Sequence, residues 1–457
     1  MLNTLNDALN NIDNFIWGMP LIVLILFTGI LLTVRLRGLQ VRHLGKALHY
    51  VFHNEDDGEG EVTSFGALCT ALSATIGTGN IVGCATAIVA GGPGALFWMW
   101  LAAFFGMATK YAEGMLAVKY RVIAEDGHTL GGPFYYIEKG MGKNFKWLAK
   151  LFCVFGTMVG LFGIGTFTQV NGITSAVNNF FDPSNVHTIS LFGMNYSISV
   201  VVAGIIVTIC AGLVIIGGIK RISKVSEVIV PFMAVTYIGV CLIIVFTHLP
   251  QVPAAFAEIV QSAFGLKAVA GGAIGAMTVA MQKGIARGIF SNEAGLGSAP
   301  IAAAAAQTNE PVRQGLVSMT GTFIDTIVIC TMTGLSIVIA GSWLNPELEG
   351  VAITMDAFQK GLPFPSFVAT FSLMLCLVFF AFTTILGWNY YGERCVEYLF
   401  NRNKAVVMGY RILYILAVFI GPYMTVKAVW NIADIFNALM AFPNLIALLA
   451  LNGGIVK

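Results

Sequence analysis

The sequence predicts an all-α protein that crosses a membrane many times. Of its 457 residues, 57% are hydrophobic and only 11% are charged, whereas ordinary soluble domains are about 25% charged. A soluble chain of this length could not cover its surface with so few charges, so the composition excludes a soluble enzyme, a nucleic-acid binder and a disordered scaffold. Because hydrocarbon leaves no water to pair with the backbone, the spans should be helices.

Eleven apolar segments are long enough to be spans, since about 20 helical residues cross roughly 30 Å of hydrocarbon. The fourth and eighth are long, and glycines interrupt the second and seventh. Only short polar stretches separate them, so we expect a single membrane domain over 1–457. The expected spans are 14–34, 65–90, 94–120, 146–180, 197–217, 222–248, 268–290, 311–342, 366–390, 405–425 and 430–452.

Lysine and arginine are distributed unevenly between the two sides of these spans. With the N-terminus outside, nearly all of the 25 fall on the inside; Lys110 lies within a span, and only Lys267, Lys360 and Lys427 lie outside. Cytoplasmic loops carry this excess of positive residues in membrane proteins. The pattern predicts an odd number of spans in the cell membrane, with the N-terminus outside and the C-terminus in the cytoplasm.

The spans divide into an extra N-terminal segment and two blocks of five, at 65–248 and 268–452. Segments 70–83 and 275–288 open these blocks and carry glycine and alanine at matching positions. Because five is odd, the second block would be inverted relative to the first. Glycine-broken segments in corresponding positions of two inverted halves indicate the binding site of a transporter.

Residues 73–83 read Ser-Ala-Thr-Ile-Gly-Thr-Gly-Asn-Ile-Val-Gly, a poor helix-forming stretch. Unwinding near Gly77–Gly79 would free backbone groups at membrane depth, where they must line a cavity or bind a ligand. The half-helix that starts near Asn80 presents N–H groups that suit a carboxylate, and the half that ends near Ile76 presents carbonyls that suit a cation. The alternative is a packing groove for a neighbouring helix.

The fourth span carries two amides, Gln169 and Asn171, which are costly in hydrocarbon unless they are paired or face water. An amide oxygen from either could accept from a substrate ammonium group, and Phe167 would wall the pocket. The alternative is hydrogen bonding between helices. In the seventh span, Met277 and Thr278 are further pocket candidates.

Few ionisable residues lie within the expected spans. Asp325, near the middle of the eighth, is expected to pair with Lys283 or Arg287 or to lie near a cation. Lys110 and Glu113 are three residues apart, so they should form a solvated pair near a cytoplasmic helix end.

Several sequence blocks resemble the alanine or glycine:cation symporter family. Gly91-Gly-Pro-Gly-Ala-Leu-Phe-Trp-Met-Trp100, followed by Leu101-Ala-Ala-Phe-Phe-Gly106, is similar to its signature. Asn292-Glu-Ala-Gly-Leu-Gly-Ser-Ala-Pro300 and Gly131-Gly-Pro-Phe-Tyr-Tyr136 are similar to further blocks. The resemblance implies inward symport of small neutral amino acids, alanine and glycine, with Na⁺. It also implies a LeuT-type 5+5 inverted repeat with one extra N-terminal helix.

The resemblance further implies a substrate site at the broken helix and a sodium site beside it. Threonine pairs in helices usually bond to their own backbone, which is the alternative for Thr383 and Thr384. Trp388 would turn its ring towards the substrate. The implied substrate-binding residues of the break are Thr75, Gly77, Thr78, Gly79 and Asn80, and the implied sodium ligands are the carbonyls of Ser73, Ile76 and Phe380 with the hydroxyls of Thr383 and Thr384.

Other functional classes fit less well. An intramembrane enzyme would need a catalytic dyad or metal ligands inside spans, but the histidines lie in loops or at a span end. A channel would need a ring of filter groups, usually from several subunits. We therefore expect a carrier that works as a monomer in lipid, without an organic cofactor or a nucleic-acid partner. A proton-coupled permease for other neutral amino acids is the alternative carrier.

Overall fold

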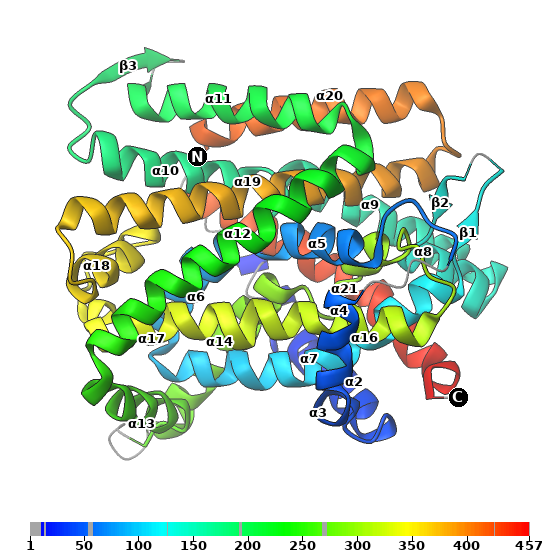
Figure 1. Ribbon diagram of the computed structural model, residues 1–457, viewed down its shortest axis with the longest axis horizontal. Coiled ribbons are helices and arrows are strands. Elements are labelled where there is room, and N and C mark those ends of the chain that lie inside the picture. Colours follow the sequence, from blue (N-terminus) through cyan, green and yellow to red (C-terminus); the bar gives the residue numbers. More distant parts are fainter. Residues whose placement is uncertain are drawn as a thin grey trace.

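The structure is a computed structural model that describes residues 11–12, 15–53, 58–125, 127–191, 194–266, 272–424 and 426–456. Most of its long helices run across Figure 1, with short helices and two hairpins at the ends of the molecule. Some expected features lie outside the described residues: residue 14 of the first span, residues 268–271 of the second block, Lys267, Lys457 and the Lys427 side chain.

Seven helical segments of the described chain are long and apolar enough to cross a membrane, or eight if the bent pair Ser64–Thr75 and Gly79–Gly91 is one span. The expectation of a helical protein with several spans is therefore confirmed. The seven segments comprise α9 (Lys146–Phe162) with α10 (Phe167–Phe181), α11 (Ile198–Ile215), α12 (Gly218–Thr247), α16 (Pro311–Thr322) with η5 (Phe323–Cys330) and α17 (Thr331–Ala340), α19 (Ser366–Leu399), α20 (Lys404–Ile420) and α21 (Val426–Val456).

The three remaining expected spans are also helical, but each is too short or not apolar enough to count among these seven or eight segments. They are α2 (Met19–Arg35), α7 (Gly94–Lys119) and α14 (Ala273–Asn292). α7 contacts α2, α13 (Val252–Ala263), α14, α15 (Ala299–Ala303) and α16. Because α7 is surrounded by protein rather than lipid, it can carry small and polar residues along its length.

The break expected in the second span is confirmed. Helix α5 (Ser64–Thr75) stops at Ile76, and the chain resumes as η1 (Gly79–Gly83) and α6 (Cys84–Gly91), bent by 51°. A Cβ atom added at Gly77 would lie 2.5 Å from Thr384 Oγ1. Glycine is therefore needed where the unwound backbone approaches α19.

The break expected within residues 275–288 is wrong, because α14 is one continuous helix. The chain leaves this helix at Glu293, with φ of 57°, and passes through Gly295 and Gly297 before α15 (Ala299–Ala303). Gly284 instead serves packing, since a Cβ atom there would lie 2.2 Å from the Ala95 carbonyl oxygen of α7. Small residues that admit a neighbouring helix are common in membrane proteins, so glycine alone did not identify the break.

Shorter elements cover the two ends of the helices. In Figure 1, α13, α18 and β3 lie at one end, and β1, β2 and α8 lie at the other. Both hairpins are antiparallel, with Val122 paired to Leu130 and Thr188 paired to Ser197. The elements are α3 (Leu39–Arg42), α4 (Leu44–Phe52), β1 (Val122–Ile123), β2 (Thr129–Leu130), α8 (Pro133–Tyr136), η2 (Ile137–Met141), η3 (Lys143–Phe145), β3 (Thr188–Leu191), β4 (Met194–Ser197), η4 (Leu249–Gln251), α13 (Val252–Ala263), η6 (Ser342–Leu344), α18 (Val351–Gly361) and η7 (Gly421–Tyr423).

Candidate substrate and cation site

Four of the five expected sodium-ligand residues lie together between α5 and α19. The Thr384 hydroxyl donates to the carbonyls of Ile76, at 3.2 Å, and Phe380, at 3.0 Å. The Thr383 hydroxyl bonds to its own helix, as the alternative expects: it donates to the carbonyls of Phe379, at 3.1 Å, and Phe380, at 3.0 Å, and lies 3.6 Å from Met233 Sδ of α12. All four side chains are fully buried. Carbonyl and hydroxyl oxygens are ligands that hard cations accept, so this group could hold a small cation between the two helices.

The fifth expected ligand residue, Ser73, lies one turn earlier in α5. Its hydroxyl donates to the Thr70 carbonyl at 2.7 Å. The expected ligand is the Ser73 carbonyl, which is in the last turn of α5 before the break. Helix-terminal carbonyls of this kind have no partner further along their own helix.

Side-chain oxygens occupy two backbone N–H groups of the break. The Gly77 N–H donates to Asn80 Oδ1, and the Thr78 N–H donates to Gln169 Oε1, each at 3.0 Å. Gln169 is held in this position because its Nε2 donates to the Ile164 carbonyl at 3.0 Å. A carboxylate is the same kind of planar oxygen acceptor, so the break presents donors of the type that a carboxylate needs.

A cavity of about 270 Å³ adjoins the break. The Thr78 hydroxyl faces this region and is buried with no partner among the described residues. The Asn171 side chain reaches the Met424 carbonyl at 3.5 Å. Helix α18 covers the broken helix, since the Thr354 hydroxyl donates to the Ile81 carbonyl at 3.2 Å. The cavity is lined by Thr78, Val82, Thr168, Asn171, Gly172, Ser175, Asn179, Glu349, Gly350, Val351, Ala352 and Trp430.

Three other expected pocket residues are not on the wall of this cavity. Phe167 packs against Ala417 and the Phe162 ring. Trp388 is fully buried and donates from Nε1 to Glu293 Oε1 at 2.8 Å. Thr75 lines a smaller cavity of about 10 Å³ on the α5 side of the break.

The expectation for Met277 and Thr278 is wrong. A Cβ atom added at Gly79 would meet Phe290 and Ser291, so the end of α14 contacts the break. At 1.5 Å per residue, Thr278 lies about 20 Å earlier along the same helix. These two residues follow from the expected break within 275–288, whereas the chain leaves the helix only at Glu293.

Asp325 does not pair with Lys283 or Arg287. Its carboxylate accepts from Asn80 Nδ2 at 2.7 Å, Ser291 Oγ at 2.9 Å and Thr326 Oγ1 at 2.7 Å. Asn80 Oδ1 also accepts a hydrogen bond from the Gly77 N–H. Through Asn80 and Ser291, Asp325 therefore connects the break at residues 76–79 to the end of α14. The Ser291 hydroxyl was not among the expected site residues, and its only signal in the sequence is its position directly before the Asn292–Pro300 block.

Arg287 pairs instead with Asp434 of α21, at 2.8 Å. Its guanidinium also lies 4.9 Å from the centre of the Trp430 ring, and that ring packs on Phe290. This group joins α14 to α21 next to the larger cavity, which Trp430 lines.

Lys110 and Glu113 are buried, so the expectation of a solvated pair is also wrong. Lys110 is 3% exposed and Glu113 is fully buried, because neighbouring helices surround α7. Glu113 Oε1 accepts from Asn444 Nδ2 at 2.6 Å and from the Gly297 N–H at 3.2 Å. A carboxylate therefore stabilises the non-helical segment 293–298 between α14 and α15, a role that the sequence pattern did not indicate.

Comparison with known proteins identifies the group of proteins to which this arrangement belongs. The sodium:alanine symporter family model matches residues 2–457. The chain belongs to the sodium:alanine symporter family. Like other members of this family, it is a sodium-coupled amino-acid symporter and not an enzyme.

Relatives of this symporter match it over nearly their whole length. It is 47% identical to the sodium/alanine symporter AgcS of Methanococcus maripaludis, with 99% of this chain and 96% of that protein covered. It is 39% identical to the probable sodium/glutamine symporter GlnT of Bacillus subtilis, with 96% and 87% covered.

A solved structure shares its fold. The structure of MhsT in complex with L-phenylalanine matches with a TM-score of 0.55 and 13% identity, covering 86% of this chain and 99% of that one. This likeness supports the LeuT-like fold of the symporter.

Proposed function

We propose that this symporter carries small neutral amino acids, alanine and glycine, into the cell together with Na⁺ by alternating access. The observation that carries the proposal is the Thr384 hydroxyl, which bridges the Ile76 carbonyl at the break and the Phe380 carbonyl of α19. A cation among these oxygens would join two elements that must separate when the site opens to the inside.

The proposed sodium ligands are the carbonyls of Ser73, Ile76 and Phe380 and the hydroxyls of Thr383 and Thr384. All are neutral, so the charge of the ion supplies the attraction while fixed dipoles replace its water. The ion would take the place of the present hydrogen bonds, and the threonine hydroxyls would turn their lone pairs towards it.

The proposed amino-acid site lies on the other side of the break. The substrate carboxylate would accept from N–H groups of residues 77–79 in place of the side-chain oxygens of Asn80 and Gln169. Thr75 and the Thr78 hydroxyl would contribute at the edges. Asn171 would accept from the substrate ammonium group, and Phe167 and Trp388 would support the walls that limit its size. Met277 and Thr278 are not part of this proposal.

The proposed architecture is eleven transmembrane helices in a LeuT-type 5+5 inverted repeat, with α2 as the extra N-terminal helix. A helix is present in each of the eleven expected ranges, and the lysine and arginine pattern supports an outside N-terminus and a cytoplasmic C-terminus. In this orientation α5 begins on the cytoplasmic side, and α18 covers the outside.

Uptake of labelled alanine and glycine into proteoliposomes tests the proposal. The expected result is uptake that requires external Na⁺, is not supported by Li⁺ at the same concentration and continues when the pH gradient is abolished. Uptake driven by a pH gradient without Na⁺ would contradict the proposal and favour a proton-coupled permease.

A further inference from the structure

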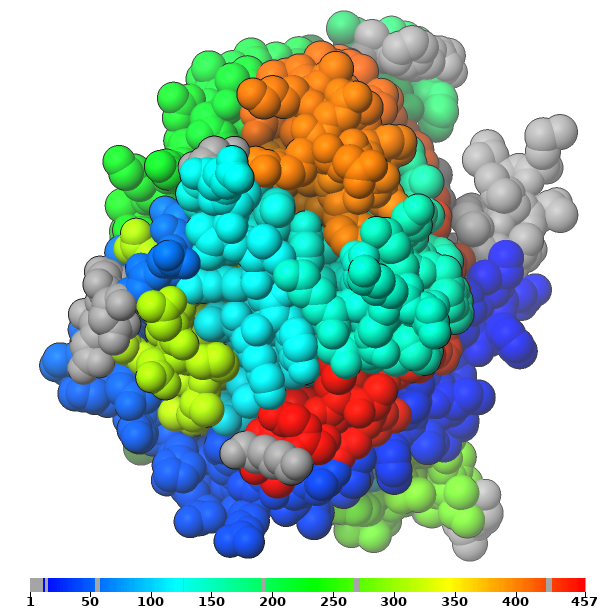
Figure 2. Space-filling view, turned by 90° about the vertical axis from the view of Figure 1, so that its right-hand side faces the viewer, coloured from blue at the N-terminus to red at the C-terminus, as the bar shows by residue number. Residues whose placement is uncertain are grey.

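The segment that leads into α5 is tied to the chain that follows α15. Val62 forms a parallel β-bridge with Ala306, and the Gln307 N–H donates to the Val62 carbonyl at 2.8 Å. Arg121, directly after α7, donates to four backbone carbonyls at 2.5–2.8 Å, those of Glu59, Ala304, Ala306 and Thr308. This face of the molecule is shown in Figure 2, where the cyan segment with β1, β2 and α8 covers its middle.

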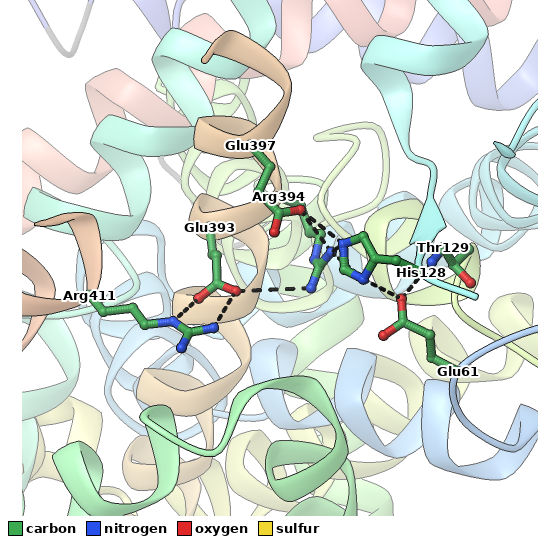
Figure 3. Close-up of polar contacts among 7 residues, drawn as sticks. All are labelled: Glu61, His128, Thr129, Glu393, Arg394, Glu397 and Arg411. Carbon is green, nitrogen blue, oxygen red and sulfur yellow. Dashed lines mark hydrogen bonds and ion pairs between the residues drawn. The ribbon is translucent and has the colours of Figure 1, made fainter. Parts of the chain in front are cut away.

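His128, in the β1–β2 hairpin, joins the same leading segment to the end of α19. Its Nδ1 lies 3.3 Å from Glu61 Oε1, and its Nε2 lies 3.2 Å from Glu397 Oε2 (Figure 3). The Thr129 N–H also donates to Glu61 Oε1, at 2.7 Å. A doubly protonated imidazole can donate to both carboxylates at once, whereas a neutral imidazole has only one N–H.

Among the residues of Figure 3, the formal charges balance when His128 is protonated. The cluster in Figure 3 contains the carboxylates Glu61, Glu393 and Glu397 and the guanidinium groups Arg394 and Arg411. Arg411 forms two hydrogen bonds to Glu393, at 2.6 and 2.8 Å, and Arg394 donates to Glu397 at 2.7 Å. Three negative and two positive groups leave one negative charge for the imidazolium to neutralise.

Solvent protons can reach this site. The His128 side chain is 19% exposed and lines a cavity of about 680 Å³. Glu397, Arg402, Lys404 and Arg411 are the other charged groups on the wall of this cavity. Arg394 also contacts His128 Nε2, so a neutral imidazole would accept from Arg394 and lose its bond to Glu397.

The environment of His128 strengthens proton binding. Burial favours the neutral imidazole, but hydrogen bonds to Glu397 and Glu61 outweigh burial and the charge of Arg394 and raise the pKa of His128 to about 9. An unperturbed histidine has a pKa of about 6.5. Burial also raises the pKa of Glu61, but the hydrogen bond from His128 and the charge of Arg394 outweigh it, so the net pKa is lowered.

We propose that His128 is a cytoplasmic proton-binding site that holds the inner end of the transport path closed, so that an alkaline cytoplasm favours inward opening. This proposal rests on the proposed function, because the orientation proposed there places the His128 end of the molecule on the cytoplasmic side. Opening would move Glu61 and α5 away from His128 and α19, and the released imidazole would return towards its ordinary proton affinity.

The direction of the pH effect follows from this release. A group that binds its proton more tightly in the closed state stabilises that state fully below about pH 6.5, and this stabilisation is lost as pH rises towards about 9. Within this window the closed-to-open ratio falls by up to about tenfold per pH unit. Outside it, His128 contributes no further pH dependence.

The test uses a distance measurement that does not depend on transport. Spin labels at Glu59→Cys and Phe400→Cys, with the exposed Cys210 replaced by Ser, report separation of the two joined segments in frozen samples. We expect the long-distance population to rise at least fivefold between pH 6.5 and 9. His128→Gln should abolish the rise, whereas His53→Gln, at an exposed histidine that stacks on His49, should preserve it.

An equal rise in the His128→Gln protein, or no rise in the unmutated one, would overturn the proposal. If His128→Gln does not fold, Glu397→Gln should move the midpoint to lower pH, and an unchanged midpoint would equally overturn it. Alanine uptake measured in parallel separates the two proposals. A pH-dependent distance without alanine uptake would refute the proposed substrate and leave the proton site standing.

Discussion

At the scale of single residues, Thr384 is the hydroxyl that reaches from α19 to the break. Thr384→Val keeps the shape of the side chain but removes this oxygen. Hydrogen bonds to charged groups contribute about 1.5–3 kcal/mol, so the Na⁺ concentration for half-maximal uptake should rise at least about tenfold. Thr383→Val should act in the same direction.

Thr370→Val is the matched control in the same helix. Its hydroxyl bonds to the Ser366 carbonyl and to Gln359, away from the break, so its sodium dependence should stay within about twofold of the unmutated protein. Sodium titrations of initial uptake rates measure all three variants. Unchanged values in both Thr383 and Thr384 variants would contradict the site.

Asp325 offers a second test, because its carboxylate accepts from three side chains that converge on it. Asp325→Asn keeps the shape but turns an amide N–H₂ towards a donor. Leaving buried donors unpaired costs about 1–3 kcal/mol. We expect a lower melting temperature and a higher KM for alanine, since Asn80 would no longer be held against the Gly77 N–H.

Asp356→Asn is the control for this variant. Asp356 pairs with Lys360 of the same helix, α18, at 2.7 Å, where the Lys360 side chain is 51% exposed, and such partly exposed pairs contribute little to stability. Thermal unfolding and uptake kinetics compare the two proteins. An Asp325→Asn protein that matches Asp356→Asn in both measurements would show that the Asp325 hydrogen bonds are not needed.

At the scale of elements, the sequence predicted the break after α5 correctly but placed another within 275–288, where α14 is continuous. Ile-Gly-Thr-Gly-Asn concentrates weak helix formers in one turn, so local propensity was enough to predict the break in the second span. Gly284 and Gly288 occur within an otherwise good helical pattern, and whether such glycines break or pack depends on how closely α7 approaches. That distance is a tertiary property.

The same limit explains the errors at charged residues. Charge alone pairs Asp325 with Lys283 or Arg287, but α21 brings Asp434 to Arg287. A position near a helix end predicts that Lys110 and Glu113 are solvated, yet surrounding helices bury α7. In contrast, Thr384 and Phe380 do lie next to Ile76. The family resemblance implied this proximity, because the sequence around each residue indicates only a break and a threonine pair.

Packing of α14 against α7 gives a prediction of its own. An added Cβ atom would lie 2.2 Å from the Ala95 carbonyl oxygen at Gly284 but 3.4 Å from Met99 Cα at Gly288. Gly284→Ala should therefore destabilise the protein by about 1–3 kcal/mol through overpacking, while Gly288→Ala should be tolerated. Thermal unfolding in detergent gives the melting temperatures of the two variants. Equal melting temperatures would show that α14 does not pack against α7 in this way.

At the scale of the whole molecule, the site lies between two ends of the helices, and contacts between elements tie each of them together. One end is covered by α18, with the Arg287–Asp434 pair beside it. The other is held by Arg121 and the His128 cluster. A carrier that bound the ion and the amino acid between such ends could expose them alternately to either side, provided that only one end opens at a time.

Coupling to sodium predicts that transport moves charge. A potential of 100 mV, negative inside, adds about 2.3 kcal/mol per charge. With one Na⁺ for each neutral amino acid, the limiting alanine gradient should rise by up to about 50-fold. Valinomycin with a potassium gradient imposes this potential on proteoliposomes, and equal potassium on both sides is the control. Accumulation that is insensitive to the potential would contradict net movement of positive charge.

The clamp made by Arg121 has a consequence for how this protein tolerates mutation. Its four acceptors are backbone carbonyls, which every amino acid supplies. As far as this clamp is concerned, the side chains at positions 59, 304, 306 and 308 can change without losing a single bond. Lysine could not replace Arg121, because an ammonium group lacks the planar fork of guanidinium donors. A single substitution at position 121 would therefore remove all four hydrogen bonds, whereas a side-chain change at any acceptor position would leave its carbonyl in place.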